Sequence, residues 1–163
     1  VTVMATEGSL VGPPWQKREN GYLLQLDNDD DNDKEDSTKD DAFSIYYEPH
    51  ADVILNNLQN VRADVMISPV VKQALPAGVP PEGQYTLVYG GDRTLQIAEH
   101  LGVKAVIPLG NAELDFEGPL VDVVQASGDE DEFEMLVGER NVGRNDEVKV
   151  ARAKPGVPLT VSL

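Results

Sequence analysis

The segment from Ser44 to His50 places a carboxylate and an imidazole at the end of a strand-like run. Its β-branched and aromatic residues favour a strand, which should stop at Pro49. Glu48 and His50 lie at the carboxyl end of this strand, where ligands commonly meet the sheet of an α/β protein. Carboxylates and imidazoles serve as general acids and bases and as metal donors. We therefore take Glu48 and His50 as candidate catalytic and metal-binding residues.

The rest of the chain offers few groups that could complete a metal centre. His100 is the only other histidine, and the chain contains no cysteine. A zinc site needs three protein ligands plus an open position, or four ligands when it is closed. Zinc, or another divalent metal, would therefore need ligands from outside these residues. In the alternative interpretation, Glu48 and His50 only hydrogen-bond backbone groups at the strand end, and no cofactor is bound.

A polar and aromatic cluster precedes the second expected strand. Trp15, Arg18, Glu19 and Asn20 lie close together in the sequence, followed by Tyr22. Amphipathic aromatic side chains beside polar groups are suited to recognising a small-molecule substrate. Trp15, Arg18 and Asn20 are thus candidate substrate-binding residues. The alternative is that Trp15 packs in the core beside a polar turn.

Two further motifs resemble ligand sites, but each has a simpler interpretation. Gly90-Gly91-Asp92 precedes a helical pattern and could hold an anion, yet it lacks both the dinucleotide-binding glycine pattern and a P-loop lysine. We interpret it as the tight start of a helix. The residues 27–41 carry a net charge of −7. A calcium loop there would need a glycine where Lys34 stands, so a solvated acidic loop is the favoured interpretation.

Length, charge and hydrophobicity restrict the number of domains, the classes of partner and the location of the protein. The 163 residues suit a single domain, 1–163, with the acidic loop 27–41 as an insertion. The net charge of −16 and the absence of a basic stripe argue against nucleic acids and anionic membranes as partners. No apolar run approaches the ~20 residues of a membrane span, and the first residues do not read as a signal peptide. We expect an intracellular, soluble protein.

Hydrophobic patterning predicts an early hairpin and then helices alternating with strands. Two caps are predicted for the helices: Asp92 at the start of one, and a capping box beginning at Ser127 for another, while Gly102 should end the first. The expected strands are 1–5, 22–26, 42–47, 63–67 and 104–109, and the expected helical segments are 52–60, 70–75, 93–101 and 129–137. Residues 85–89 are either a strand or an extended connection, and 148–150 and 159–161 are extended segments at the end of the chain. This order predicts an α/β (α+β) fold, a mixed β-sheet with helices on one face.

Several segments together resemble the carboxyl-terminal half of a metallo-β-lactamase-fold hydrolase of the plant and algal type. They are Gly12–Leu24, Tyr46–His50, Ala63–Val71, Lys104–Asn111 and Pro155–Pro158. The resemblance implies half of an αββα sandwich. The missing amino-terminal half, or a homo-oligomer, would cover the sheet. It also implies a plastid location and a metal-activated water acting on an ester, lactone, amide or phosphoester.

The chain departs from this family at the positions where relatives carry histidines. The region after the first strand reads Thr6-Glu7-Gly8, and the late position reads Leu109-Gly110-Asn111. Asn111 is therefore taken as a candidate substrate-binding residue, and ungapped alignment puts His50 where relatives have an aspartate. Two hypotheses follow. The chain is part of a metal-dependent hydrolase, or it is a degenerate, non-catalytic scaffold domain that docks on a protein partner.

Overall fold

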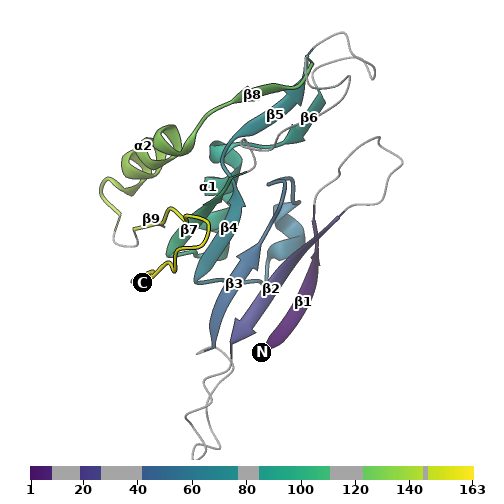
Figure 1. Cartoon of the computed structure of the whole chain (residues 1–163). Coiled ribbons are helices and arrows are strands. Elements are labelled where there is room, and N and C mark those ends of the chain that lie inside the picture. The colour runs from purple at the N-terminus through teal and green to yellow at the C-terminus, as the bar shows by residue number, and fades with distance from the viewer. Residues whose placement is uncertain (9–18, 27–41, 77–84, 111–122, 145–146) are drawn as a thin grey trace, which may run out of the picture.

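The computed structural model describes residues 1–8, 19–26, 42–76, 85–110, 123–144 and 147–163 (Figure 1). Trp15, Arg18, Asn111 and the acidic segment 27–41 lie outside the described residues. The described elements follow the chain in the order β1 (Thr2–Glu7), β2 (Asn20–Leu26), β3 (Phe43–Tyr47), the 3₁₀ turn η2 (Leu55–Leu58), β4 (Val65–Pro69), β5 (Lys72–Leu75), β6 (Tyr85–Val88), α1 (Gly91–Leu101), β7 (Ala105–Leu109), β8 (Gln125–Ser127), α2 (Glu130–Asn141) and β9 (Lys149–Val150).

Six strands form one mixed sheet in the order β1-β2-β3-β4-β7-β9. The first three are antiparallel neighbours, and β3, β4, β7 and β9 run parallel. The hairpin of β2 and β3 has the predicted pairing, with the acidic segment between the two strands in sequence. This arrangement confirms the predicted α/β class with a mixed sheet. It also puts the carboxyl end of β3 beside the carboxyl ends of β4 and β7, at one rim of the sheet.

One face of this sheet is covered by α1, η2 and α2, and the core lies between them. Leu23, Tyr46, Met66 and Val106 point to this face and belong to one buried cluster, together with Leu95, Ile97 and Leu101 of α1 and with Phe133 and Val137 of α2. The hydroxyl of Thr94, near the start of α1, donates to the carbonyl of Pro69 over 2.5 Å. This bond fastens α1 to the end of β4.

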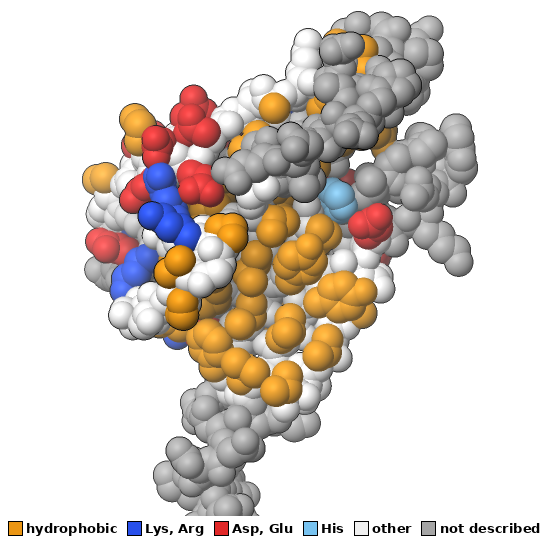
Figure 2. All heavy atoms as spheres, viewed as in Figure 1, with side chains coloured by type: hydrophobic (Ala, Val, Ile, Leu, Met, Phe, Trp, Pro, Cys, Tyr) orange, Lys and Arg blue, Asp and Glu red, His pale blue; other side chains and the backbone are white. Residues whose placement is uncertain are grey.

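The opposite face of the large sheet is apolar, and none of the described helices packs on it. Figure 2 shows apolar side chains gathered over β2, β3 and β4 on the face toward the viewer. Val3 is 60% exposed and Tyr22 is 40% exposed. We call this surface the open face, and the registers of the strands assign to it Val3, Tyr22, Leu24, Leu26, Phe43, Ile45, Tyr47, Ile67 and Ile107.

Three short strands form a second, antiparallel sheet in the order β6-β5-β8. The prediction of a helical turn at 70–75 is therefore wrong, since Lys72–Leu75 is the central strand of this sheet. Four residues are too few for their sequence periodicity to distinguish a helical turn from a strand. Pairing with β6 and β8, distant in sequence, decides the conformation.

The predicted helix at 52–60 is also wrong, because only Leu55–Leu58 forms a 3₁₀ turn. Ile54, which precedes it, is extended and supplies no side-chain cap, and Ala51 adopts a positive φ of 53°. Burial of Val53 and Leu58 in the core holds this segment in place. Its apolar residues thus reflect packing and not helical periodicity.

The helix ends show which cap predictions hold. Gly102 ends α1 in the left-handed conformation, and the N–H of Val103 bonds the carbonyl of Ala98, as the pattern predicted. The two N-caps are wrong. α1 begins after Gly90 without a side-chain cap, and the cap of α2 is Asp129, whose carboxylate accepts from the N–H of Glu132.

The last segments of the chain are irregular apart from β9. Residues 159–161, predicted as an extended segment, form no strand in the structure. Arg152 holds this part of the chain against α2 through ion pairs of 2.6 Å with Asp131 and with Glu134. None of the helices in the described ranges is long and apolar enough to cross a bilayer.

Candidate functional site

Glu48 and His50 lie at the rim of the large sheet, immediately after β3. The N–H of Glu48 donates to the carbonyl of Ile67, which extends the pairing of β3 with β4 by one residue. The carbonyl of His50 accepts from the N–H of Tyr89, just before α1. Two backbone hydrogen bonds therefore fix this turn between β4 and the start of α1.

The carboxylate of Glu48 is fully buried and forms part of a chain of hydrogen bonds. The Tyr46 hydroxyl donates to Oε2 of Glu48 over 3.2 Å, and Oγ1 of Thr6 lies 3.2 Å from the same hydroxyl. Because the single phenol proton is used on Glu48, the Thr6 hydroxyl is the donor to Tyr46. The buried acid thus accepts from the Tyr46 hydroxyl of β3, which in turn accepts from the Thr6 hydroxyl of β1.

Burial, followed by the charge of Glu48, raises the pKa of the Tyr46 phenol above its ordinary value. The phenol therefore stays protonated across the neutral range and remains a donor to Glu48. Gly21 of β2 makes this close approach possible. A Cβ at Gly21 would lie 2.7 Å from Thr6 Oγ1, 2.7 Å from the Tyr46 hydroxyl and 2.9 Å from Glu48 Oε2.

His50 lies next to two carboxylates. Its backbone N–H points to Oε1 of Glu48 at 3.4 Å, and its Nε2 lies 3.2 Å from Oε2 of Glu19, which immediately precedes β2. The side chain is 20% exposed, and the buried Nδ1 has no hydrogen-bond partner among the described residues. The imidazole is therefore oriented by Glu19, while Glu48 fixes the backbone that carries it.

These residues do not by themselves make a zinc site. The described part of the chain contains no group of three histidine, cysteine, aspartate or glutamate residues that could hold a metal ion. His50 and Glu19 are at most two donors, one fewer than a catalytic zinc site requires. A metal at this rim would have to be completed by other residues.

A recess of about 390 Å³ adjoins Glu19, where the rim meets the open face. It is lined by Glu19, Asn20, Tyr22, Tyr47 and Pro49. The structure thus places Asn20, predicted from sequence to bind substrate, within this recess and close in sequence to Glu19. The rings of Tyr22 and Tyr47 line it from adjacent strands.

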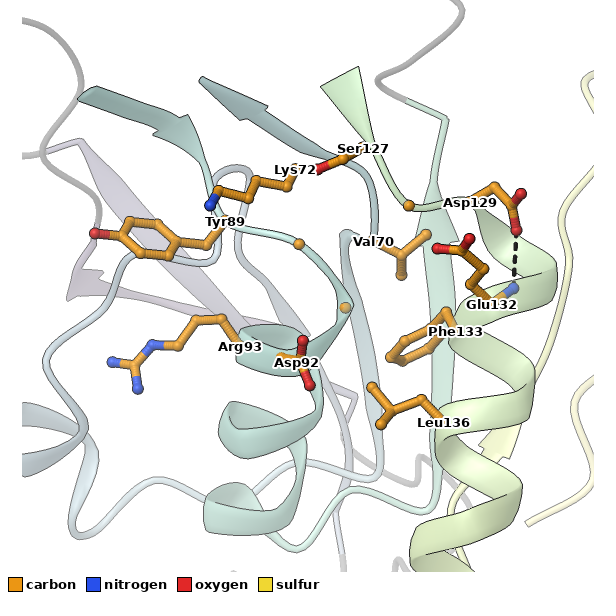
Figure 3. Close-up of a pocket in the computed structure, with 13 residues that line it drawn as sticks. Val70, Lys72, Tyr89, Asp92, Arg93, Ser127, Asp129, Glu132, Phe133 and Leu136 are labelled. Carbon is orange, nitrogen blue, oxygen red and sulfur yellow. Dashed lines mark hydrogen bonds between the residues drawn. The ribbon is translucent and has the colours of Figure 1, made fainter. Parts of the chain in front are cut away.

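A larger cavity of about 490 Å³ lies between the first turns of α1 and α2, outside the rim described above (Figure 3). Gly90 and Gly91 line it, but three carboxylates also do, those of Asp92, Asp129 and Glu132. A Cβ at Gly91 would come within 2.7 Å of the Phe133 ring. The missing side chain at Gly91 therefore lets α1 and α2 approach each other. This supports the interpretation of the glycine pair as a tight helix start.

The residues that sequence reasoning missed are Thr6, Gly21 and Tyr46. Tyr46 had a usable signal, since residues two apart in a strand share a face and Tyr46 precedes Glu48 by two. Thr6 and Gly21 had none, because their closeness to Glu48 depends on the register of β1 and β2 with β3. His100, in the last turn of α1, lies apart from the rim in a position that favours a basic side chain.

Comparison with known proteins identified no relative of this chain. No protein-family model matches it, and neither a curated protein nor a solved structure does.

Proposed function

We propose that the chain is one layer of an αββα sandwich of the metallo-β-lactamase type, and that it acts together with a second layer docked on its open face. The open face carries this proposal. Within the described ranges, helices cover only one side of the large sheet, and the other side presents apolar residues from β1, β2, β3, β4 and β7. Contiguous apolar surfaces of this kind normally mark an interface.

The chemistry of the open face indicates what would cover it. Two sheets in a sandwich pack their apolar faces about 10 Å apart, with side chains interdigitated between them. Ile45, Tyr47 and Ile67 are only partly buried and stand in adjacent rows for such contacts. The chain as a whole carries a charge of −16. The complementary layer should therefore be apolar at its centre and neutral or basic at its rim.

Binding of an apolar dye tests whether the open face is available in the isolated chain. Ile45→Lys puts a charge in the middle of this face, so we expect it to lower the fluorescence of 8-anilinonaphthalene-1-sulfonate bound to the folded chain. Met135→Lys is the control, because Met135 is 69% exposed on α2, away from the open face. Equal fluorescence in both variants would count against the proposal.

Metal-dependent hydrolysis is a second candidate, favoured by the position of His50 and Glu19 beside the recess. In this candidate His50 Nε2 and Glu19 are two metal donors, and the covering layer supplies the others. A bound divalent metal would supply an activated water for an ester, lactone, amide or phosphoester. Glu48 would hold the turn that carries His50, and Asn20 would contact the substrate. A plastid location belongs to the same proposal.

Metal content separates this candidate from a non-catalytic scaffold. The protein expressed from its complete reading frame should contain zinc, iron or manganese in stoichiometric amount if the candidate is right. His50→Ala should lose most of this metal, whereas His100→Ala should retain it. Metal-free parent protein, or equal metal in both variants, would favour the scaffold.

A further inference from the structure

The recess beside Glu19 combines two aromatic side chains with an exposed carboxylate. Tyr22 and Tyr47 are direct partners across β2 and β3, so their side chains leave the same face of the sheet with Cβ atoms about 5 Å apart. Both line the recess of about 390 Å³, and Tyr22 is 40% exposed. The two tyrosines therefore form a paired aromatic wall that a ligand can reach from solvent.

The carboxylate of Glu19 is the only acidic group among the described residues that line this recess. The side chain is 51% exposed, and its Oε2 lies 3.2 Å from Nε2 of His50. Its Oε1 makes no hydrogen bond with another described residue. The described lining includes no lysine or arginine. The negative charge of Glu19 thus has no permanently charged cationic partner there.

Aromatic rings and a carboxylate in one recess attract positive charge. The face of a tyrosine ring carries negative charge from its quadrupole, and a nearby carboxylate adds a Coulombic attraction. On the face shown in Figure 2, the lysine and arginine side chains gather on one side of the apolar surface, and a histidine with a neighbouring acid lies on the other. The net charge of −16 further favours the approach of a cation.

The kind of cation follows from the groups that the recess offers. A metal ion would need further donors, because the described residues contain no group of three that could hold one. A primary ammonium is strongly hydrated and must exchange that water for hydrogen-bond acceptors. A quaternary ammonium has no N–H donors, so its methyl groups can lie against ring faces while its charge stays near a carboxylate.

We propose that this recess binds a quaternary ammonium group, with its methyl groups against Tyr22 and Tyr47 and its charge beside Glu19. His50 acts as a positioning residue, because its Nε2 orients the Glu19 carboxylate from the rim. The volume of about 390 Å³ lies within the usual range of small-molecule pockets. This inference goes beyond the proposed function, since it uses groups of this chain alone and requires neither a covering layer nor a metal.

Choline and 3,3-dimethylbutan-1-ol, its uncharged carbon isostere, test the proposal on the unaltered chain. The two molecules have nearly the same shape, so a difference in binding reports the positive charge. Titration followed by NMR of the tyrosine ring signals should give a dissociation constant in the millimolar range for choline, and binding of the isostere should be at least about tenfold weaker. Absence of choline binding, or equal binding of the two molecules, would overturn the proposal.

Substitutions locate the binding within the recess. Tyr47→Leu keeps an apolar side chain but removes a ring, so choline affinity should fall about three- to tenfold. Tyr47→Phe keeps the ring and should bind within about twofold of the parent. Glu19→Gln keeps the shape of the side chain without its charge and should also weaken choline binding. Unchanged affinity in both Tyr47→Leu and Glu19→Gln would overturn the proposal.

Tyr89→Leu is the matched control, because Tyr89 is 38% exposed and does not line this recess. Its choline affinity should equal that of the parent chain. An equal loss of affinity in Tyr89→Leu and Tyr47→Leu would show that choline binds exposed tyrosines without preference, and this result would overturn the assignment to the recess.

Discussion

The Tyr46 hydroxyl lies 3.2 Å from Oε2 of Glu48, and neither side chain is exposed to solvent. The two residues are next but one in the chain and lie on the face of the sheet that carries the helices. Because a buried carboxylate is costly without donors, this bond contributes to holding Glu48 within the core. Glu48 in turn accepts from the backbone of His50. This hydrogen bond therefore connects the buried core with the partly buried imidazole of His50 at the rim.

Removal of the phenol hydroxyl should destabilise the fold. Tyr46→Phe leaves the buried Glu48 carboxylate with one donor fewer and the Thr6 hydroxyl without its acceptor, so we expect a loss of about 1–3 kcal/mol in the free energy of unfolding. Urea denaturation measures this loss. The matched control is Tyr22→Phe, because Tyr22 is 40% exposed and its variant should stay within about 0.5 kcal/mol of the parent. Equal losses of unfolding free energy in the two variants would show that the hydrogen bond from Tyr46 to Glu48 does not stabilise the fold.

A methyl group at Gly21 should disturb the same hydrogen bonds from the other side. In Gly21→Ala the new Cβ would approach three polar atoms at 2.7–2.9 Å, so we expect about 1–3 kcal/mol of destabilisation from overpacking. Gly138→Ala is the comparison, since a Cβ at Gly138 meets no atom within 4 Å in the middle of α2. That variant should be stabilised by about 0.5–1 kcal/mol. If Gly21→Ala has the same thermal unfolding midpoint as the parent, the tight packing around Gly21 is contradicted.

Sequence patterns could predict the central strands of the large sheet, because β3 is rich in aromatic residues and β4 begins with an apolar run. They could also predict the end of α1, since Gly102 and Val103 form a local motif that needs no distant partner. The errors at 52–60 and 70–75 arose where tertiary contacts decide the backbone. Glu48 and His50 were found as a pair, but Thr6 and Gly21 reach Glu48 only through strand register.

The N-cap of α2 can be tested by mutation, because the structure assigns it to Asp129 and the sequence pattern had predicted a capping box at Ser127. The carboxylate of Asp129 accepts from the N–H of Glu132 at 2.8 Å, whereas Ser127 lies in β8. Asp129→Ala should therefore cost about 1 kcal/mol of stability, the usual value of a lost N-cap. Ser127→Ala should cost much less. Chemical denaturation of the two variants compares them, and the reverse order would restore the capping box predicted from sequence.

Asp64 should make the stability of the sheet depend on pH in the acidic range. Partial burial alone would raise the pKa of Asp64, but hydrogen bonds from Lys104 and from the N–H and hydroxyl of Ser44 lower it below its ordinary 3.8. A lowered pKa contributes stability above 3.8, and this contribution is lost as the pH falls toward the folded-state value. The difference in stability between the parent and Asp64→Asn should therefore be constant near neutrality and shrink below about pH 4. Urea denaturation at pH 7 and pH 3 measures it, and an unchanged difference would contradict the assignment.

The accessibility of the open face tests the central claim most directly. Tyr22→Cys introduces one thiol on this face, at a position that is 40% exposed in the chain. Met135→Cys on α2 serves as the control. We predict that a maleimide reagent labels both thiols in the isolated 163-residue chain, but only the control thiol in the protein expressed from its complete reading frame with its partners. Equal labelling of Tyr22→Cys in both preparations would contradict a covered sheet face.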